Sequence, residues 1–246
     1  NLHKRIALNI ISFVGTDKRS MVLGFMIATA FLSAFLSNTS TSIMMLPIGI
    51  AIISQVSSSK KNKESNFGKV LMLGIAYSAS IGGFSTLYGT PPNLILKSNI
   101  EQFFNYTLDF DYWFMMALPL SILLLFICWY YLVNFTFTLS KNENISRDQI
   151  RVKLNSLGKI KYEEIIVLLI FIGFVFSLLL KSKLQLIFNS IDDTIIAIFF
   201  AILLFILNTK NRNQKILNWK DSHKIPWDII LLFGGGLSLA AAMQGS

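Results

Sequence analysis

The chain has 246 residues, of which 53% are hydrophobic and only 14% are charged. That composition excludes an ordinary soluble domain and indicates an all-α polytopic membrane protein. The net charge of +9 would favour nucleic acid binding in a soluble protein. Here the Lys and Arg residues lie in short segments between apolar stretches, as the positive-inside rule describes. We therefore expect a lipid bilayer, and no nucleic acid, as the partner of this surface.

Residues 1–19 are predicted to form an interfacial helix followed by a turn, since a helix-like amphipathic stretch there carries Lys4 and Arg5 at one end. Residues 20–56 then form two apolar arms around a run of small polar residues at 37–42. Each arm is about 15 residues long, shorter than the roughly 20 residues of a membrane span. Basic residues flank both outer ends, which places both ends on the cytoplasmic side. This pattern favours a re-entrant helical hairpin, and two short spans joined by a polar external turn are the alternative.

Residues 67–97 are predicted to form a discontinuous transmembrane helix. Its apolar run is interrupted at 81–93, where several glycines and the pair Pro91-Pro92 occur. Proline removes backbone donors and glycine allows unwound conformations, so the helix breaks within the membrane. Transporters build ion sites from such breaks, whereas a kink that serves only helix packing is the structural alternative.

Plainer segments follow. We predict transmembrane helices at 111–137, 162–180 and 194–208, and the start of a further one at 226–246. The last contains the glycine run 234–236. A phosphate-binding loop needs a strand before the glycines, so the run favours close helix packing instead.

The charge of the connecting segments alternates along the chain. Segments 1–20, 55–69, 138–161 and 209–224 are basic, and segments 98–112 and 181–193 are acidic or neutral. The positive-inside rule then predicts a multi-pass protein of the cell inner (plasma) membrane, with 55–69, 138–161 and 209–224 in the cytoplasm. Residues 138–161 are the cytoplasmic linker of this scheme.

The two interruptions, 37–42 and 82–93, contain no Lys, Arg, His, Asp or Glu. They offer hydroxyl groups, the amides of Asn38 and Asn93, and backbone groups. Hydrolysis and proton relay need acids, bases or metal ligands, which argues against a membrane enzyme. With Cys128 as the only cysteine and His3 far from His223, a thiolate or imidazole metal cluster has little support. Oxygen atoms suit Na⁺ and N–H groups suit anions, so the chemistry indicates cation-coupled anion transport.

The motifs FLSAFLSNTSTSIMMLPI at 31–48 and YSASIGGFSTLYGTPPNLIL at 77–96 resemble the divalent anion/sodium symporter family. Members of that family carry di- and tricarboxylates and sulfate. The resemblance implies Na⁺-coupled symport of a succinate-like dicarboxylate, no enzymatic activity, and a homodimer that works by an elevator mechanism. It assigns 20–56 and 67–97 to the transport domain, and 162–180 with 194–208 to the scaffold of a second repeat.

The resemblance also implies the site residues. The expected Na⁺ ligands are Ser33, Ser37, Asn38 and the backbone at Gly89. The expected contacts to the anion are Asn38, Thr39, Tyr88 and Thr90. The family has a second Ser-Asn-Thr hairpin that this chain lacks, so we expect a central fragment that does not transport alone. A related proton-coupled or arsenite-type carrier, and a non-transporting truncated product, remain alternatives.

Overall fold

The computed structural model describes residues 2–14, 17–57, 64–137, 139, 158–185, 191–210, 214–225 and 227–244. Throughout these residues the regular elements are helices, and β-pairing is limited to an isolated bridge between Asn208 and Lys215. The all-α prediction is therefore confirmed for the described part. The chain divides into two compact units, Asn1–Lys159 and Ile160–Ser246.

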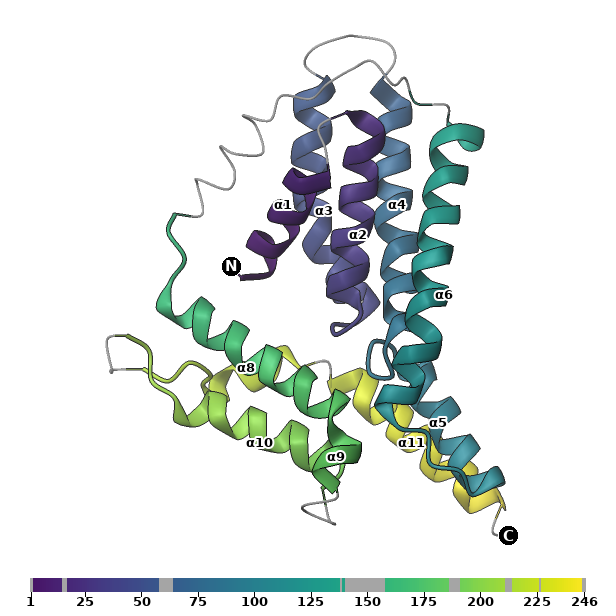
Figure 1. Ribbon diagram of the computed structural model, residues 1–246, viewed down its shortest axis with the longest axis vertical. Helices are drawn as coiled ribbons and strands as arrows, with labels where there is room; N and C mark the ends of the chain where they lie inside the picture. The colour runs from purple at the N-terminus through teal and green to yellow at the C-terminus, as the bar shows by residue number, and fades with distance from the viewer. Residues whose placement is uncertain are drawn as a thin grey trace. The chain divides into compact units, whose positions relative to one another are not determined.

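The first unit is a helical bundle organised around its fourth helix. Its elements are α1 (Leu2–Val14), α2 (Lys18–Ser33), α3 (Asn38–Ser57), α4 (Glu64–Ser85), α5 (Pro91–Phe104), α6 (Phe110–Tyr130) and the π-helical turn η1 (Tyr131–Thr136). Helix α4 packs against α2, α3 and α6, and α1 packs against α2 (Figure 1). Large apolar side chains buried between these helices form the core, among them Phe25, Met45, Phe67 and Leu71.

Helices α2 and α3 form an antiparallel hairpin whose ends have local causes. Asp17 precedes α2, and its carboxylate accepts a hydrogen bond from the Ser20 backbone N–H at 3.1 Å, which caps the helix. At the turn, the Ser37 hydroxyl accepts from the Ser40 N–H at 3.3 Å and so caps the start of α3. The polar run predicted to interrupt the apolar arms therefore begins as a turn and continues as the first turn of α3.

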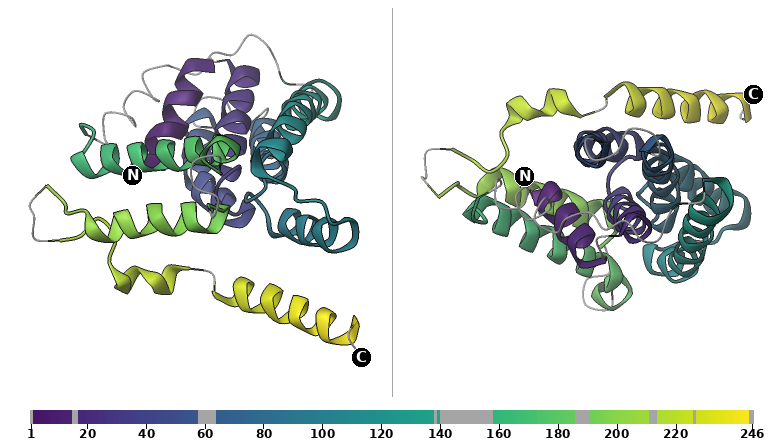
Figure 2. Two further views of the ribbon diagram at one scale, coloured as in Figure 1. Left: turned by 60° about the horizontal axis from the view of Figure 1, so that its bottom comes forward. Right: turned by 90° about the horizontal axis from the view of Figure 1, so that it is seen from above.

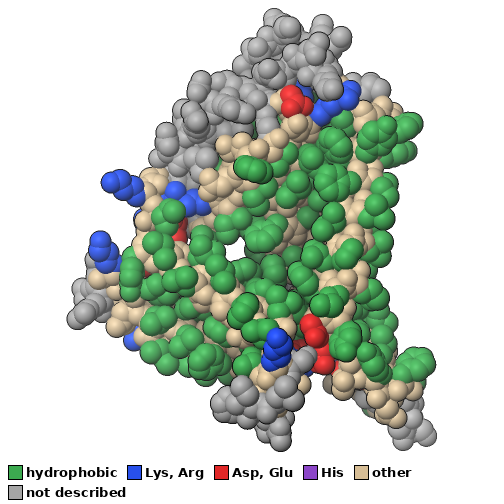
Figure 3. All heavy atoms as spheres, in the orientation of Figure 1, with side chains coloured by type: hydrophobic (Ala, Val, Ile, Leu, Met, Phe, Trp, Pro, Cys, Tyr) green, Lys and Arg blue, Asp and Glu red, His purple; other side chains and the backbone are tan. Residues whose placement is uncertain are grey.

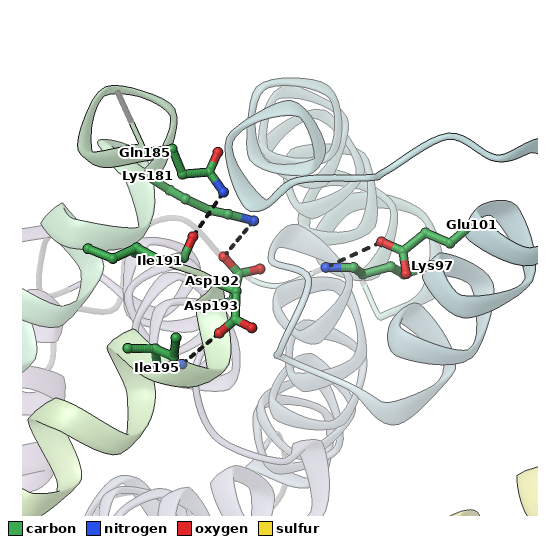
Figure 4. Close-up of polar contacts among 8 residues, drawn as sticks. All are labelled: Lys97, Glu101, Lys181, Gln185, Ile191, Asp192, Asp193 and Ile195. Atoms are coloured by element: carbon green, nitrogen blue, oxygen red, sulfur yellow. Dashed lines mark hydrogen bonds and ion pairs between the residues drawn. The ribbon is translucent and has the colours of Figure 1, made fainter. Parts of the chain in front are cut away.

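The second interruption separates α4 from α5. Helix α4 ends at Ser85, and α5 begins at Pro91, where the missing proline N–H leaves no further donor unpaired. Helix α5 then runs beyond residue 97 to Phe104 and ends at Asn105, which has a left-handed φ of 50°. On its surface Lys97 and Glu101 form an ion pair at 3.7 Å (Figure 4).

The second unit pairs two apolar helices. Its elements are α8 (Tyr162–Leu179), α9 (Lys181–Gln185), α10 (Asp193–Ile206), the 3-10 turn η2 (Trp219–Lys224) and α11 (Trp227–Gln244). Helices α8 and α10 lie side by side in Figures 1 and 2. A buried ion pair of 3.1 Å between Lys181 and Asp193 joins α9 to α10 (Figure 4). The Asp192 carboxylate caps α10 by accepting from the Ile195 N–H at 2.8 Å.

The glycine run of α11 has open surroundings among the described residues. A methyl group placed at Gly234, Gly235 or Gly236 would meet no atom within 4 Å in the part of the chain that the structure describes. The close helix packing expected from this run therefore has no counterpart among the described residues.

Within the part of the chain that the structure describes, three helices are long and apolar enough to cross a membrane. They are Asn66–Ser85, Phe110–Thr136 and Tyr162–Leu179, and Asn38–Ser54 and Asp193–Ile206 are shorter apolar helices. Hydrophobic side chains cover the outer side of α6 in Figure 3. These helices are those of a membrane protein. The predicted linker at 138–161 lies largely outside the described residues.

Candidate functional site

The candidate site lies where the α2–α3 turn meets the α4–α5 break, and both belong to the first unit. The Thr86 hydroxyl, just beyond α4, donates to the Ala34 carbonyl, just beyond α2. Figure 1 shows the turn and the break at the same end of the bundle. Two interruptions that the sequence separates by some fifty positions are thus in direct contact.

Glycines allow this close approach of backbones. A methyl group at Gly82 would lie 2.2 Å from the Ala30 carbonyl oxygen, and one at Gly83 would lie 2.1 Å from Asn38 Oδ1. One at Gly89 would lie 2.4 Å from the Gly83 carbonyl oxygen. The sequence suggested that these glycines permit unwinding. That interpretation is wrong for Gly82 and Gly83, because both lie within helix α4, where their role is to admit α2 and the Asn38 side chain.

Ser33 and Asn38 form the polar centre of the site. The Ser33 hydroxyl is fully buried, 2.9 Å from Asn38 Oδ1 and 2.7 Å from the carbonyl oxygen of Ala79 on α4. With a single proton, it donates to one of these acceptors at a time. Three oxygen atoms, one each from α2, α3 and α4, therefore converge. Two of them belong to predicted Na⁺ ligands, Ser33 and Asn38.

The other predicted residues of the turn lie on its more open side. The Ser37 hydroxyl donates to the Ser40 hydroxyl at 2.7 Å in addition to its capping bond. Thr39 is exposed in the first turn of α3. The structure therefore brings Ser33 and Asn38 together and leaves Ser37 and Thr39 beside them along the same stretch of chain.

Tyr88, Gly89 and Thr90 fill the α4–α5 break. Gly89 is buried against Gly83, and Thr90 is half-buried directly before α5. The Tyr88 ring stacks on Phe110 of α6, with ring centroids 5.8 Å apart and planes 12° apart. The aromatic ring thus holds the break against α6, while Gly89 keeps the backbone close to the last turn of α4.

Asn93 supports the break but was not among the predicted site residues. Its side chain is buried, and Nδ2 donates to the carbonyls of Gly83 at 3.1 Å and Thr86 at 2.8 Å. Carbonyls at a helix C-terminus have no partner within the helix, so this amide satisfies them from α5. The sequence shows Asn93 as the amide of the second interruption. Its role in pairing with these carbonyls is visible only in the structure.

Helix ends determine what this arrangement can bind. Helices α2 and α4 end here, and the negative ends of their dipoles favour a cation. Helix α3 begins here, and the backbone N–H groups of its first residues suit an anion. The described residues contain no group of three or more His, Cys, Asp or Glu able to hold a metal. Hydroxyl, amide and carbonyl oxygens remain, the ligands that Na⁺ accepts.

Comparison with known proteins agrees with this chemistry. The family model described as "Sodium:sulfate symporter transmembrane region" matches residues 1–246. The chain is 39% identical over 257 aligned residues to the sodium-dependent dicarboxylate transporter SdcS of Staphylococcus saprophyticus, covering 100% of this chain and 50% of that protein. For the SdcS of Staphylococcus aureus the identity is 41% over 261 residues, covering 100% and 49%.

The chain thus spans about half the length of the curated relatives it matches. The match of the family model is not confined to the two motifs but extends over all 246 residues. The resemblance inferred from those motifs is confirmed, and the chain belongs to the sodium:sulfate symporter family.

Proposed function

We propose that this chain forms part of a longer parent protein that carries di- or tricarboxylates, or a related divalent anion, across the cytoplasmic membrane together with Na⁺. The observation that carries the proposal is the convergence of Ser33, Asn38 and the Ala79 carbonyl between helix ends, with no ionisable side chain among them. The printed name of the relatives, sodium-dependent dicarboxylate transporter, supports both the ion and the substrate class.

In this proposal the cation and the anion occupy neighbouring positions. Na⁺ binds to Ser33, Ser37, Asn38 and the backbone at Gly89. The carboxylate of the substrate binds to Asn38, Thr39, Tyr88 and Thr90. The positive end of α3 and the bound Na⁺ together offset the charge of the anion in the absence of an Arg or Lys. Coupling follows because the anion binds well only where the cation has already bound.

The tight glycine contacts also support a mechanical proposal. Helices α2, α3 and α4 approach so closely at Gly82 and Gly83 that they move as one body. We therefore assign the re-entrant hairpin and the broken helix to a transport domain that moves, elevator fashion, against a scaffold that includes 162–180 and 194–208. The parent protein is a homodimer of the plasma membrane with its basic segments in the cytoplasm, and it is not an enzyme.

Uptake of labelled succinate by the full-length parent protein in proteoliposomes tests the proposed function. We expect accumulation with an inward Na⁺ gradient and only background uptake when choline replaces Na⁺. A proton gradient imposed without Na⁺ is expected to drive no uptake. Succinate uptake that is indifferent to Na⁺, or that follows the proton gradient, would overturn the proposal.

Removal of the Asn38 side chain tests the assignment of the site. Asn38→Ala deletes the oxygen that faces Ser33 and the amide that faces the substrate, so Na⁺-dependent uptake is expected to be lost. Asn99→Ala, at an exposed position on α5, is the matched control and should transport like the parent. Because the Asn38 variant is expected to fold, its elution by size-exclusion chromatography should match that of the control. Retained Na⁺-dependent uptake in the Asn38 variant would refute the assignment.

A further inference from the structure

Thr41, in the first turns of α3, has a buried hydroxyl group with no hydrogen-bond partner in the described part of the chain. Its relative exposure is 0%, and Oγ1 is among the few buried side-chain atoms there that lack a partner. Other buried hydroxyls on these helices behave differently. Thr29 donates to the Phe25 carbonyl at 2.6 Å and Ser78 to the Gly74 carbonyl at 2.5 Å, each one turn earlier. An unpaired buried hydroxyl costs free energy, so its presence at Thr41 needs an explanation.

The pairing of α3 with α4 fixes the depth at which Thr41 lies. Gly68 faces Ile53, Gly49 faces Met72, and Gly83 faces Asn38, so each step forward along α3 matches an equal step back along α4. Thr41 comes three residues after Asn38 and is therefore level with Ser80, next to Ala79. The Ala79 carbonyl is the acceptor that Ser33 contacts. Thr41 thus lies at the depth of the Ser33–Ala79 contact.

The direction of the side chain agrees with this depth. Thr41 belongs to the buried stripe of α3 that continues with Met45, Ile48 and Ile52. Helical side chains lean toward the N-terminus of their helix, so Thr41 leans toward Ser37 and Asn38. Its backbone N–H bonds the Ser37 carbonyl at 2.9 Å, which fixes the turn between them. The hydroxyl therefore lies on the buried side of α3, at the end of the helix that carries Asn38.

We propose that the Thr41 hydroxyl is an additional oxygen ligand of the cation bound at this turn. The inference rests on the proposed function and adds to it a ligand outside the Ser-Asn-Thr motif. The Thr41 hydroxyl does not donate to the carbonyl one turn earlier. Its lone pairs and its orientation therefore remain available to a cation. Its desolvation, unfavourable without the ion, is offset when the ion binds, which links Na⁺ binding to the packing of α3 on α4.

The test compares Thr41→Val, which keeps the shape and removes the hydroxyl, with Thr41→Ser, which keeps the hydroxyl, in the full-length parent protein. For Thr41→Val the Na⁺ concentration that gives half-maximal succinate uptake is expected to rise about tenfold, and for Thr41→Ser less than about threefold. Thr29→Val removes a hydroxyl that is already paired with Phe25 and serves as the matched control, with an unchanged Na⁺ dependence.

Thermal unfolding of the purified variants separates a ligand from a structural residue. Without Na⁺, Thr41→Val should melt at or above the temperature of the parent protein, because a buried unpaired hydroxyl has been removed. The rise in melting temperature on adding Na⁺ should shrink in Thr41→Val and persist in Thr41→Ser and Thr29→Val. A Thr41→Val variant that unfolds without Na⁺, or that keeps the parent's Na⁺ response, would overturn the inference. If instead the parent protein itself showed no Na⁺ dependence, the proposed function would fail.

Discussion

Because Gly83 has only a hydrogen atom as its side chain, the hairpin can approach the broken helix closely at this residue. Gly83→Ala would place a methyl group 2.1 Å from Asn38 Oδ1, so the Asn38 amide or the helix α4 must shift. We expect Na⁺-dependent uptake to be lost and the free energy of unfolding to fall by about 1–3 kcal/mol, the usual cost of overpacking.

The chain offers a matched control for this substitution. Gly236→Ala adds the same methyl group on α11, where it meets no atom within 4 Å among the described residues. It should lower neither uptake nor the melting temperature, since alanine favours a helix more than glycine does. If Gly83→Ala transports as well as Gly236→Ala does, the close contact with Asn38 has no functional role.

Individual residues also show how far the sequence could predict the site. Ser33 and Asn38 were predictable from the resemblance to the symporter family, and the structure brings the two together. Thr41 and Asn93 could not be assigned in this way. Whether a hydroxyl or amide is paired depends on the register between helices, and composition and spacing within one segment do not contain that register.

Among the elements, the break between α4 and α5 depends on an amide rather than on the proline pair alone. Asn93→Leu removes the donor that pairs with the carbonyls of Gly83 and Thr86, so the Gly83 carbonyl loses this partner and the Thr86 carbonyl keeps only the 3.4 Å bond from the Gly89 N–H. We expect the free energy of unfolding to fall by about 1–3 kcal/mol. Thermal melts should show this loss, whereas Asn99→Leu, exposed on the same helix, should melt like the parent. Equal melting temperatures for the two variants would mean that the break does not need this amide.

The start of helix α2 gives a prediction with a defined pH dependence. Burial acts to raise the pKa of Asp17, but hydrogen bonds to its carboxylate, foremost those from Ser20, outweigh burial and lower the pKa below 3.8. A lowered folded-state pKa means that the ionised carboxylate stabilises the fold above pH 3.8 and that this contribution is lost as the pH falls. Asp17→Ala should therefore cost about 1 kcal/mol of stability at pH 7, and this cost should shrink as the pH falls below 3.8 toward the lowered folded-state pKa.

Asn is also a good N-cap but does not titrate, so Asp17→Asn is the control for this helix end. Asp17→Asn should keep most of the stability of the parent at pH 7. The pH dependence of stability that comes from this side chain should be absent in it. Urea unfolding at several pH values provides the measurement. An Asp17→Ala difference that stays constant from pH 7 to well below pH 3.8 would show that the carboxylate is not the cap.

For the whole molecule, the helices and their order could be predicted from apolar length and charge, whereas helix ends needed the structure. Residue 97 was predicted to end the broken helix, yet α5 continues to Phe104, and Lys97 and Glu101 pair one turn apart on its surface. Segment charge predicts which ends share a side of the membrane. It does not determine how deep the polar turn lies, since a re-entrant hairpin and two short spans give the same charge pattern.

Labelling of single cysteines in the parent protein, with Cys128 replaced by serine, distinguishes these two topologies. Thr107→Cys, in the segment after α5, should react with a membrane-impermeant maleimide from outside, and Lys69→Cys, near the start of α4, only after permeabilisation. In a re-entrant hairpin, Ser40→Cys lies within the membrane at the ligand site. It should therefore react more slowly than Thr107→Cys, and Na⁺ with succinate should slow it further. A Ser40→Cys that reacts from outside as fast as Thr107→Cys and gains no protection would instead indicate two short spans joined by an external turn, and would separate the polar turn from the ligand site.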